Sequence, residues 1–135
     1  MDFDVQKEDR NIYACVSDYE NSLLVYDQRS DKPVHQLVDY HSATPTSCRF
    51  TKGNKIVTAG VDGLLQVFDM TSKQVVLKVQ ENNVISTLNS DPYEQRYCLT
   101  TNFDKTVNIY DLSTGAYRHL PKDDMHFEHT GCIGC

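Results

Sequence analysis

Tryptophan is absent from this 135-residue chain, and glycine and proline are scarce, with six and four copies. No apolar segment approaches the roughly 18 residues that a membrane-spanning helix needs. Residues 1–4 carry neither the positive charge nor the apolar stretch that opens a signal peptide. The sequence therefore predicts neither a membrane span nor a signal peptide.

Positive charge is also in short supply. The chain has 13 lysines and arginines against 19 aspartates and glutamates, a formal net charge of -6. The basic residues are scattered and form no run, whereas a protein that binds nucleic acid through its phosphates needs a basic patch. The composition therefore argues against an electrostatic nucleic-acid binder.

The cysteine content favours a reducing compartment. An odd number of cysteines does not suit a complete set of disulfides, and the sequence has no Asn-x-Ser/Thr acceptor for glycosylation. The five cysteines are Cys15, Cys48, Cys98, Cys132 and Cys135. We expect a cytoplasmic or nuclear protein.

What the chain does contain is an internal repeat of 42 residues. Three segments align without a gap and end in aspartates at this spacing, namely residues 22–27, 64–69 and 106–111. Apolar residues recur in them with a period of two, which predicts strands. A fixed period in this range indicates one structural unit stacked on copies of itself. Stacked units of this kind more often present a binding surface than an active site.

Further strands are predicted around each of these segments. They comprise residues 12–17, 55–59 and 97–101 before the segments, 34–38, 74–79 and 116–120 after them, and 46–50 and 84–88 at the start of units. The Asp62-Gly63 pair between two apolar runs is a strong hairpin signal. We predict an all-β chain of four-stranded antiparallel meanders without helices. The approximate units are 1–40, 41–80 and 81–121, with 122–135 starting a fourth.

The pattern resembles the WD-repeat family of β-propellers. In the middle unit, His41 stands at the histidine of the family's Gly-His pair, Asp62 lies in the tight turn, and Phe68-Asp69 replaces Trp-Asp. Gln80 stands at the histidine position of the third unit. The resemblance implies a buried structural network through His41, Ser47, Thr58, Asp62, Thr100, Asp104 and His129. Without tryptophan this network is incomplete, at a cost of roughly 1 kcal/mol for each missing buried bond.

The resemblance implies a partial propeller of about three blades, because both ends of the chain fall within a blade. Propellers need about four to eight blades to close a ring. Two explanations remain open. Either the sequence is a piece of a longer protein that supplies the remaining blades, or copies of the chain associate to complete a ring.

By the same resemblance, partners bind at the top of the ring. The family's partner-facing positions correspond to Tyr19, Thr44, Thr46, Val61, Asn83, Ile85 and Phe103. Several of these are apolar where a solvated loop would be polar, which suits an anchor for a protein or peptide. The alternative is that the loops pack on each other. We expect a non-catalytic interaction scaffold that needs no cofactor.

A second function is suggested by the sequence Tyr26-Asp27-Gln28-Arg29. It is similar to the Trp-Asp-x-Arg ending by which the adaptor of cullin-type ubiquitin ligases recognises WD-repeat substrate receptors. Asp27 and Arg29 would then contact the adaptor. The alternative is an ordinary surface arginine after a strand.

Two chemical alternatives are weaker. His41, Ser47 and Asp62 could form a catalytic triad, but their spacing is the one that a blade network requires, and no Gly-x-Ser-x-Gly motif is present. The tail offers zinc-type ligands in His126, His129, Cys132 and Cys135. Their close spacing would crowd all four onto one segment, whereas structural zinc sites draw on separated pairs. We expect neither an enzyme nor a metal site, and leave metal binding by the tail open.

Overall fold

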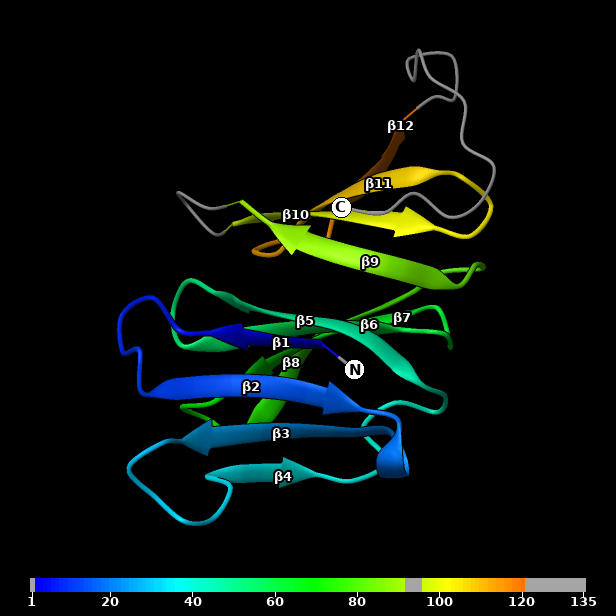
Figure 1. Ribbon diagram of the computed structural model, residues 1–135. Helices are drawn as coiled ribbons and strands as arrows, with labels where there is room; N and C mark the ends of the chain where they lie inside the picture. The colour runs from blue at the N-terminus through cyan, green and yellow to red at the C-terminus, as the bar shows by residue number, and fades with distance from the viewer. Residues whose placement is uncertain (1, 92–95, 121–135) are drawn as a thin grey trace.

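The computed structural model describes residues 2–91 and 96–120, which form three four-stranded antiparallel sheets in chain order (Figure 1). The first sheet contains β1 (Asp2–Val5), β2 (Ile12–Ser17), β3 (Ser22–Asp27) and β4 (His35–Leu37). The second contains β5 (Pro45–Thr51), β6 (Lys55–Gly60), β7 (Leu64–Asp69) and β8 (Gln74–Gln80). The third contains β9 (Ile85–Ser90), β10 (Tyr97–Asn102), β11 (Val107–Asp111) and β12 (Tyr117–Leu120). Each sheet is a meander, as predicted.

The sequence predicted no helix, and the described residues contain one short departure from that expectation. Residues Tyr19–Asn21, between β2 and β3, form a single 3-10 turn. Glu20 and Asn21 there have φ of 55° and 46°, in the left-handed region. The all-β architecture agrees with propeller blades, although the described residues do not close into a ring. The predicted start of a fourth unit, 122–135, lies outside them.

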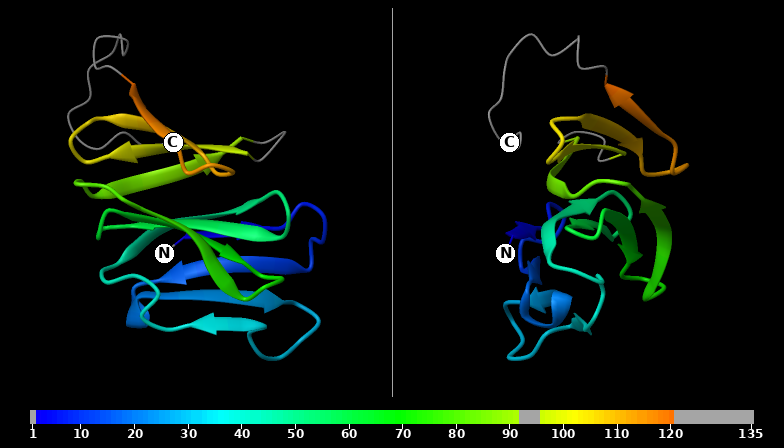
Figure 2. Two further views of the ribbon diagram at one scale, coloured as in Figure 1. Left: turned by 180° about the vertical axis from the view of Figure 1, so that it is seen from behind. Right: turned by 90° about the vertical axis from the view of Figure 1, so that its right-hand side faces the viewer.

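The sheets lie face to face, with β5 between β1 and β9 (Figure 1 and Figure 2). Two apolar cores fill the spaces between them. The core between the first and second sheets contains Ala14, Val16, Leu23, Val25, Cys48, Phe50, Ile56, Phe68 and Met70. The core between the second and third contains Val57, Ala59, Leu65, Val67, Ile85, Leu88, Cys98 and Tyr110.

The middle sheet is buried on both faces because its strands are apolar on both faces. In β7, Leu65 and Val67 enter the core shared with the third sheet, whereas Phe68 enters the core shared with the first. All three side chains are at most 2% exposed. Burying each contributes about 1.5–3 kcal/mol. The middle sheet is therefore covered on both sides, by the first sheet and by the third.

The aspartates that repeat every 42 residues share one structural task. The carboxylates of Asp27, Asp69 and Asp111 accept hydrogen bonds from the backbone N–H two residues later, at 2.9, 2.9 and 3.0 Å. Such a bond stabilises the tight turn that follows a strand. The repeat therefore retains its aspartate even though no tryptophan precedes it.

Two acidic side chains also join the first sheet to the second. The Asp2 carboxylate accepts the Cys48 N–H at 3.3 Å, and the Asp4 carboxylate accepts the Phe50 N–H at 2.9 Å. β5 is the first strand of its meander, so these backbone groups have no ladder partner. The carboxylates satisfy them and thereby fix β1 against β5.

Candidate functional site

The connections between strands lie at two ends of the sheets. The β2–β3, β6–β7 and β10–β11 turns and the links between sheets share one end, which we call the top face (right in Figure 1). The β1–β2, β3–β4 and β5–β6 connections lie at the other end, the bottom face (left in Figure 1). The residues predicted to bind partners belong to the top face.

His41 anchors the top face of the second sheet. Its Nδ1 lies 3.0 and 3.2 Å from the two carboxylate oxygens of Asp62, and its Nε2 lies 2.8 Å from the Thr58 hydroxyl. Burial lowers the pKa of His41, partly opposed by the neighbouring Asp62 carboxylate. A neutral ring fits both bonds, because Nδ1–H donates to Asp62 while Nε2 accepts from Thr58.

Asp62 gathers the surrounding backbone. Its carboxylate also accepts the N–H groups of Ser42 and Leu64, each at 3.0 Å. A Cβ on Gly60 would lie 3.0 Å from the Asp62 carboxylate and 3.0 Å from the Thr44 carbonyl, so a larger residue would have to displace one of them. The network holds the link into β5 and the β6–β7 turn in fixed positions.

Ser47 is not part of this network. It was the third residue of the candidate triad of His41, Ser47 and Asp62. It is buried, but both ring nitrogens of His41 are already bonded to Asp62 and Thr58. In this arrangement no described hydrogen bond joins the Ser47 hydroxyl to His41. The structural network that was predicted is thus found for His41, Thr58 and Asp62, and not for Ser47.

The third sheet uses different residues at the equivalent place. The alignment put Gln80 at the histidine position, but Gln80 is exposed and donates to the Asp62 carbonyl at 2.8 Å. The next residue, Glu81, is buried and accepts hydrogen bonds from the Asn108 amide at 3.2 Å and from the Tyr110 hydroxyl. Burial, together with the bond to Glu81, raises the pKa of Tyr110. Sequence alignment missed Glu81 because a carboxylate does not resemble an imidazole.

Thr100 and Asp104 are not joined in the third sheet as they were predicted to be. The Thr100 hydroxyl is buried without a hydrogen-bond partner among the described residues. Asp104 instead accepts the Asn83 amide at 2.7 Å and the Thr106 N–H at 3.1 Å, at the surface. The reason is the missing histidine, without which nothing bridges the two side chains. His129, the last predicted member, lies outside the described residues.

Three apolar side chains stand out on the top face. Tyr19, Val61 and Phe103 are 73%, 40% and 57% exposed, and they are 42 residues apart. Each lies in the connection between the second and third strands of its sheet. The same position in three successive sheets therefore presents an apolar group to solvent.

The other predicted partner-facing residues differ in accessibility. Thr44 is exposed. Asn83 is half-buried, and its side-chain amide donates a hydrogen bond to Asp104. Thr46 donates its hydroxyl to the Ile85 carbonyl at 2.9 Å and so ties β5 to β9. The Ile85 side chain is fully buried in the second core. Ile85 therefore packs the sheets together, and its side chain cannot meet a partner as expected.

Arg29, of the predicted adaptor motif, lies on the bottom face after β3. Its guanidinium makes two hydrogen bonds to Asp27, at 2.9 and 2.7 Å, and one to Asp9 at 3.2 Å. The bonds from Arg29 lower the pKa of Asp27 to about 2. The arginine side chain is nevertheless 60% exposed. It is held in one orientation at the surface.

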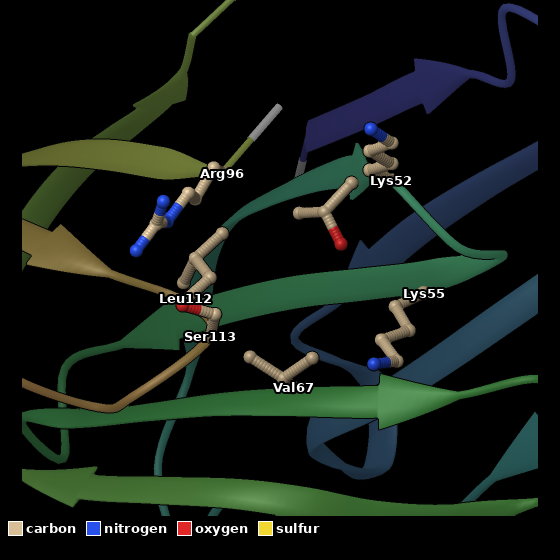
Figure 3. Close-up of a pocket in the computed structure, with 7 residues that line it drawn as sticks. Lys52, Lys55, Val67, Arg96, Leu112 and Ser113 are labelled. Carbon is tan, nitrogen blue, oxygen red and sulfur yellow. The ribbon is translucent and has the colours of Figure 1, made fainter. Parts of the chain in front are cut away.

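The bottom face also carries a pocket of about 520 Å³ between the second and third sheets (Figure 3). Its lining consists of Thr51, Lys52, Lys55, Val67, Arg96, Leu112 and Ser113. Sequence reasoning missed this pocket because the cationic residues come from different repeats and do not follow the 42-residue period. Only the packing of the two sheets brings them together.

Across 2–91 and 96–120, no three His, Cys, Asp or Glu side chains are close enough together to hold a metal ion. Within those ranges no helix is long and apolar enough to span a membrane. The proposed zinc ligands His126, His129, Cys132 and Cys135 lie outside the described residues. Burial raises the pKa of the Cys98 thiol to about 12.

Comparison with known proteins gives a distant relationship. No family model matches the chain. Over 92 residues, the chain is 28% identical to U3 small nucleolar RNA-associated protein 15 of Schizosaccharomyces pombe. The match covers 67% of this chain and 19% of the relative, so the chain corresponds to about a fifth of that protein's length.

Proposed function

We propose that the chain is part of a non-catalytic, WD-repeat-like scaffold that binds a protein or peptide through its top face. The observation that carries this proposal is the apolar group at one position of three successive repeats, Tyr19, Val61 and Phe103. Exposed apolar side chains on structured turns are typical anchors for a partner. The polar groups around them, such as Asn83 and Asp104, would form the rim of the contact.

The distant relative supports a role inside a larger assembly. Its name associates it with a small nucleolar RNA, and a scaffold that joins protein partners suits such a particle without binding RNA itself. The net charge of -6 favours protein partners over direct contact with RNA phosphates. We therefore propose a nuclear location, with the cytoplasm as the alternative.

The test is to place charge on the proposed contact surface. Val61→Glu combined with Phe103→Glu should abolish capture of partners from nuclear extract, because an apolar anchor cannot accept a buried carboxylate. Val76→Glu is the matched control, since Val76 is 50% exposed but lies on β8. Unchanged capture by a folded double variant would exclude the top face as the binding surface.

A second function, substrate receptor of a cullin-type ubiquitin ligase, is favoured by one observation. Asp27 and Asp9 hold Arg29 in a defined orientation at the surface of the bottom face. Arg29→Ala should then abolish co-purification with the ligase adaptor, while Lys32→Ala in the same connection should not. Equal recovery of the adaptor with all three proteins would exclude this function.

The outward face of the first sheet offers a further contact. Phe3 and Val5 are exposed there, and the rings of Tyr13 and Tyr26 stack beside them with centroids 5.3 Å apart. A face of this kind suits another sheet, supplied by further blades of a longer protein or by a second copy of the chain.

A further inference from the structure

The bottom-face pocket between the second and third sheets has a lining of unusual charge for this acidic chain. Lys52 lies in the β5–β6 connection, Lys55 begins β6, and Arg96 directly precedes β10. In Figure 3, Arg96 lies on the side formed by the third sheet and the two lysines on the side formed by the second. Three cationic side chains thus surround one pocket, in a protein whose net charge is -6.

The arginine side of the pocket is fixed in place. Arg96 makes two hydrogen bonds to Asp111, at 3.2 and 3.0 Å, and its guanidinium lies 5.3 Å from the centre of the Tyr97 ring. Asp111 is held in turn by the Ser113 N–H at 3.0 Å and the Ser113 hydroxyl at 2.6 Å. A guanidinium fixed this way loses little side-chain entropy when a ligand binds.

The lysine side is free of direct ion pairs among the described residues. Lys55 is half-buried and Lys52 is exposed. Asp111 pairs with Arg96, whereas Asp69, the cross-strand partner of Lys55, makes no ion pair with it. The lining itself contains three cationic residues and no carboxylate. A phosphate ester carries about -1.5 to -2 charges at neutral pH and suits a lining of this sign.

The rest of the lining identifies the kind of molecule that would carry the phosphate. Val67 and Leu112 make part of the wall apolar, and Thr51 and Ser113 add hydroxyl groups. A nucleic acid needs cations spread along its backbone, whereas these are confined to one pocket. A phosphorylated side chain of a peptide needs one pocket for the phosphate and apolar surface for its own methylene or methyl groups.

We propose that this pocket binds a phosphoserine or phosphothreonine of a partner protein, with the phosphate held between Arg96 and the two lysines. The site is separate from the top face and would give the scaffold a second contact that depends on phosphorylation. No bond is made or broken, so the protein acts as a reader of the modification.

The experiment measures binding of a labelled peptide, Ala-Leu-phosphothreonine-Leu-Ala, by fluorescence anisotropy, against its unphosphorylated form and a 20-nucleotide polyuridine strand. The phosphopeptide should bind at least tenfold more tightly than the unphosphorylated peptide, because charge-assisted bonds to phosphate are lost without it. Lys55→Ala should weaken binding roughly tenfold, and Lys52→Ala with Lys55→Ala should abolish it. Lys55→Arg should retain binding, which distinguishes lost charge from lost folding.

Lys32→Ala is the matched control, because it removes one charge from the same face outside the pocket. The Val61→Glu, Phe103→Glu protein should bind the phosphopeptide normally, so failure of the top-face proposal would not affect this result. Equal affinity for both peptides would overturn the proposal. Equal weakening of phosphopeptide binding by Lys32→Ala and by Lys55→Ala would also overturn it. Binding of polyuridine alone, with the same dependence on the two lysines, would overturn it as well.

Discussion

The hydroxyl of Tyr110, on β11 of the third sheet, donates a hydrogen bond to the carboxylate of Glu81, in the link between β8 and β9. In the second sheet, the link into the first strand is held through His41 instead. His41 lies in the connection before the second sheet, and Glu81 lies in the connection before the third. Each connection is therefore hydrogen-bonded to the sheet that follows it, once through an imidazole and once through a carboxylate.

Replacing Tyr110 by phenylalanine isolates this bond. Tyr110→Phe leaves the buried Glu81 carboxylate with one partner fewer, so the free energy of unfolding should fall by about 1–3 kcal/mol. Urea denaturation followed by circular dichroism measures the change. Tyr26→Phe is the control, because Tyr26 occupies the same repeat position and no described hydrogen bond involves its hydroxyl. A similar loss in both variants would contradict a specific role for the Glu81 bond.

The pKa of His41 predicts how stability depends on pH. Burial lowers this pKa below the ordinary value of 6.5, so the unfolded chain takes up a proton at a higher pH than the folded chain does. The free energy of unfolding should therefore be constant above about pH 6.5 and fall as the pH decreases from there towards the folded pKa, by at most about 1.4 kcal/mol per pH unit. Chemical denaturation between pH 5 and 7.5 measures the slope.

His41→Gln should reduce that slope, because glutamine does not titrate. His35 also has a pKa lowered by burial and by the charge of Lys73, so it contributes part of the total. His35→Gln serves as the comparison and should leave the His41 contribution in place. If the slope is the same in the wild-type and the His41→Gln protein, the ring is not held neutral by its surroundings.

The strands could be predicted from sequence because their signal is local. Alternation of apolar residues and the turn aspartates located eleven of the twelve strands of the described residues, all except β1 at Asp2–Val5. Neither feature depends on tryptophan. The hydroxyl-bearing and charged residues were less predictable, since their partners are chosen by packing between sheets.

Ile85 and the bottom-face pocket illustrate that difference. The strand predicted at 84–88 contained Ile85, and the family resemblance assigned that residue to the partner-facing surface, but β9 turns its side chain into the core. Lys55 and Arg96 are far apart in sequence and belong to different sheets. They line the same pocket because the second sheet packs on the third, and the sequence pattern does not reveal how the sheets pack.

Gly60 offers a test of the His41 network by crowding. Its Cβ would lie 3.1 Å from the His41 ring nitrogen and 3.0 Å from the Asp62 carboxylate, so Gly60→Ala should lower the free energy of unfolding by about 1–3 kcal/mol. Gly53→Ala is the contrast, because Gly53 has open space around it but a φ of 85°. That variant should lose only the dihedral cost of about 1–2 kcal/mol and keep the pH slope assigned to His41. Gly60→Ala, in contrast, should change the pH slope of the free energy of unfolding. An unchanged slope in that variant would mean that the His41 network tolerates the extra carbon.

The outward face of the first sheet predicts how the chain behaves in solution. Phe3 is 65% exposed on β1, beside the exposed Val5 and the stacked tyrosine rings. Such an apolar sheet face should drive self-association that increases with protein concentration. Sedimentation velocity over a range of concentrations should give a mass above that of one chain. The double variant Phe3→Glu, Val5→Lys should restore the monomer. Val76→Glu should leave the association unchanged, because β8 lies in another sheet. A wild-type chain that stays monomeric at every concentration would show that this face does not drive association.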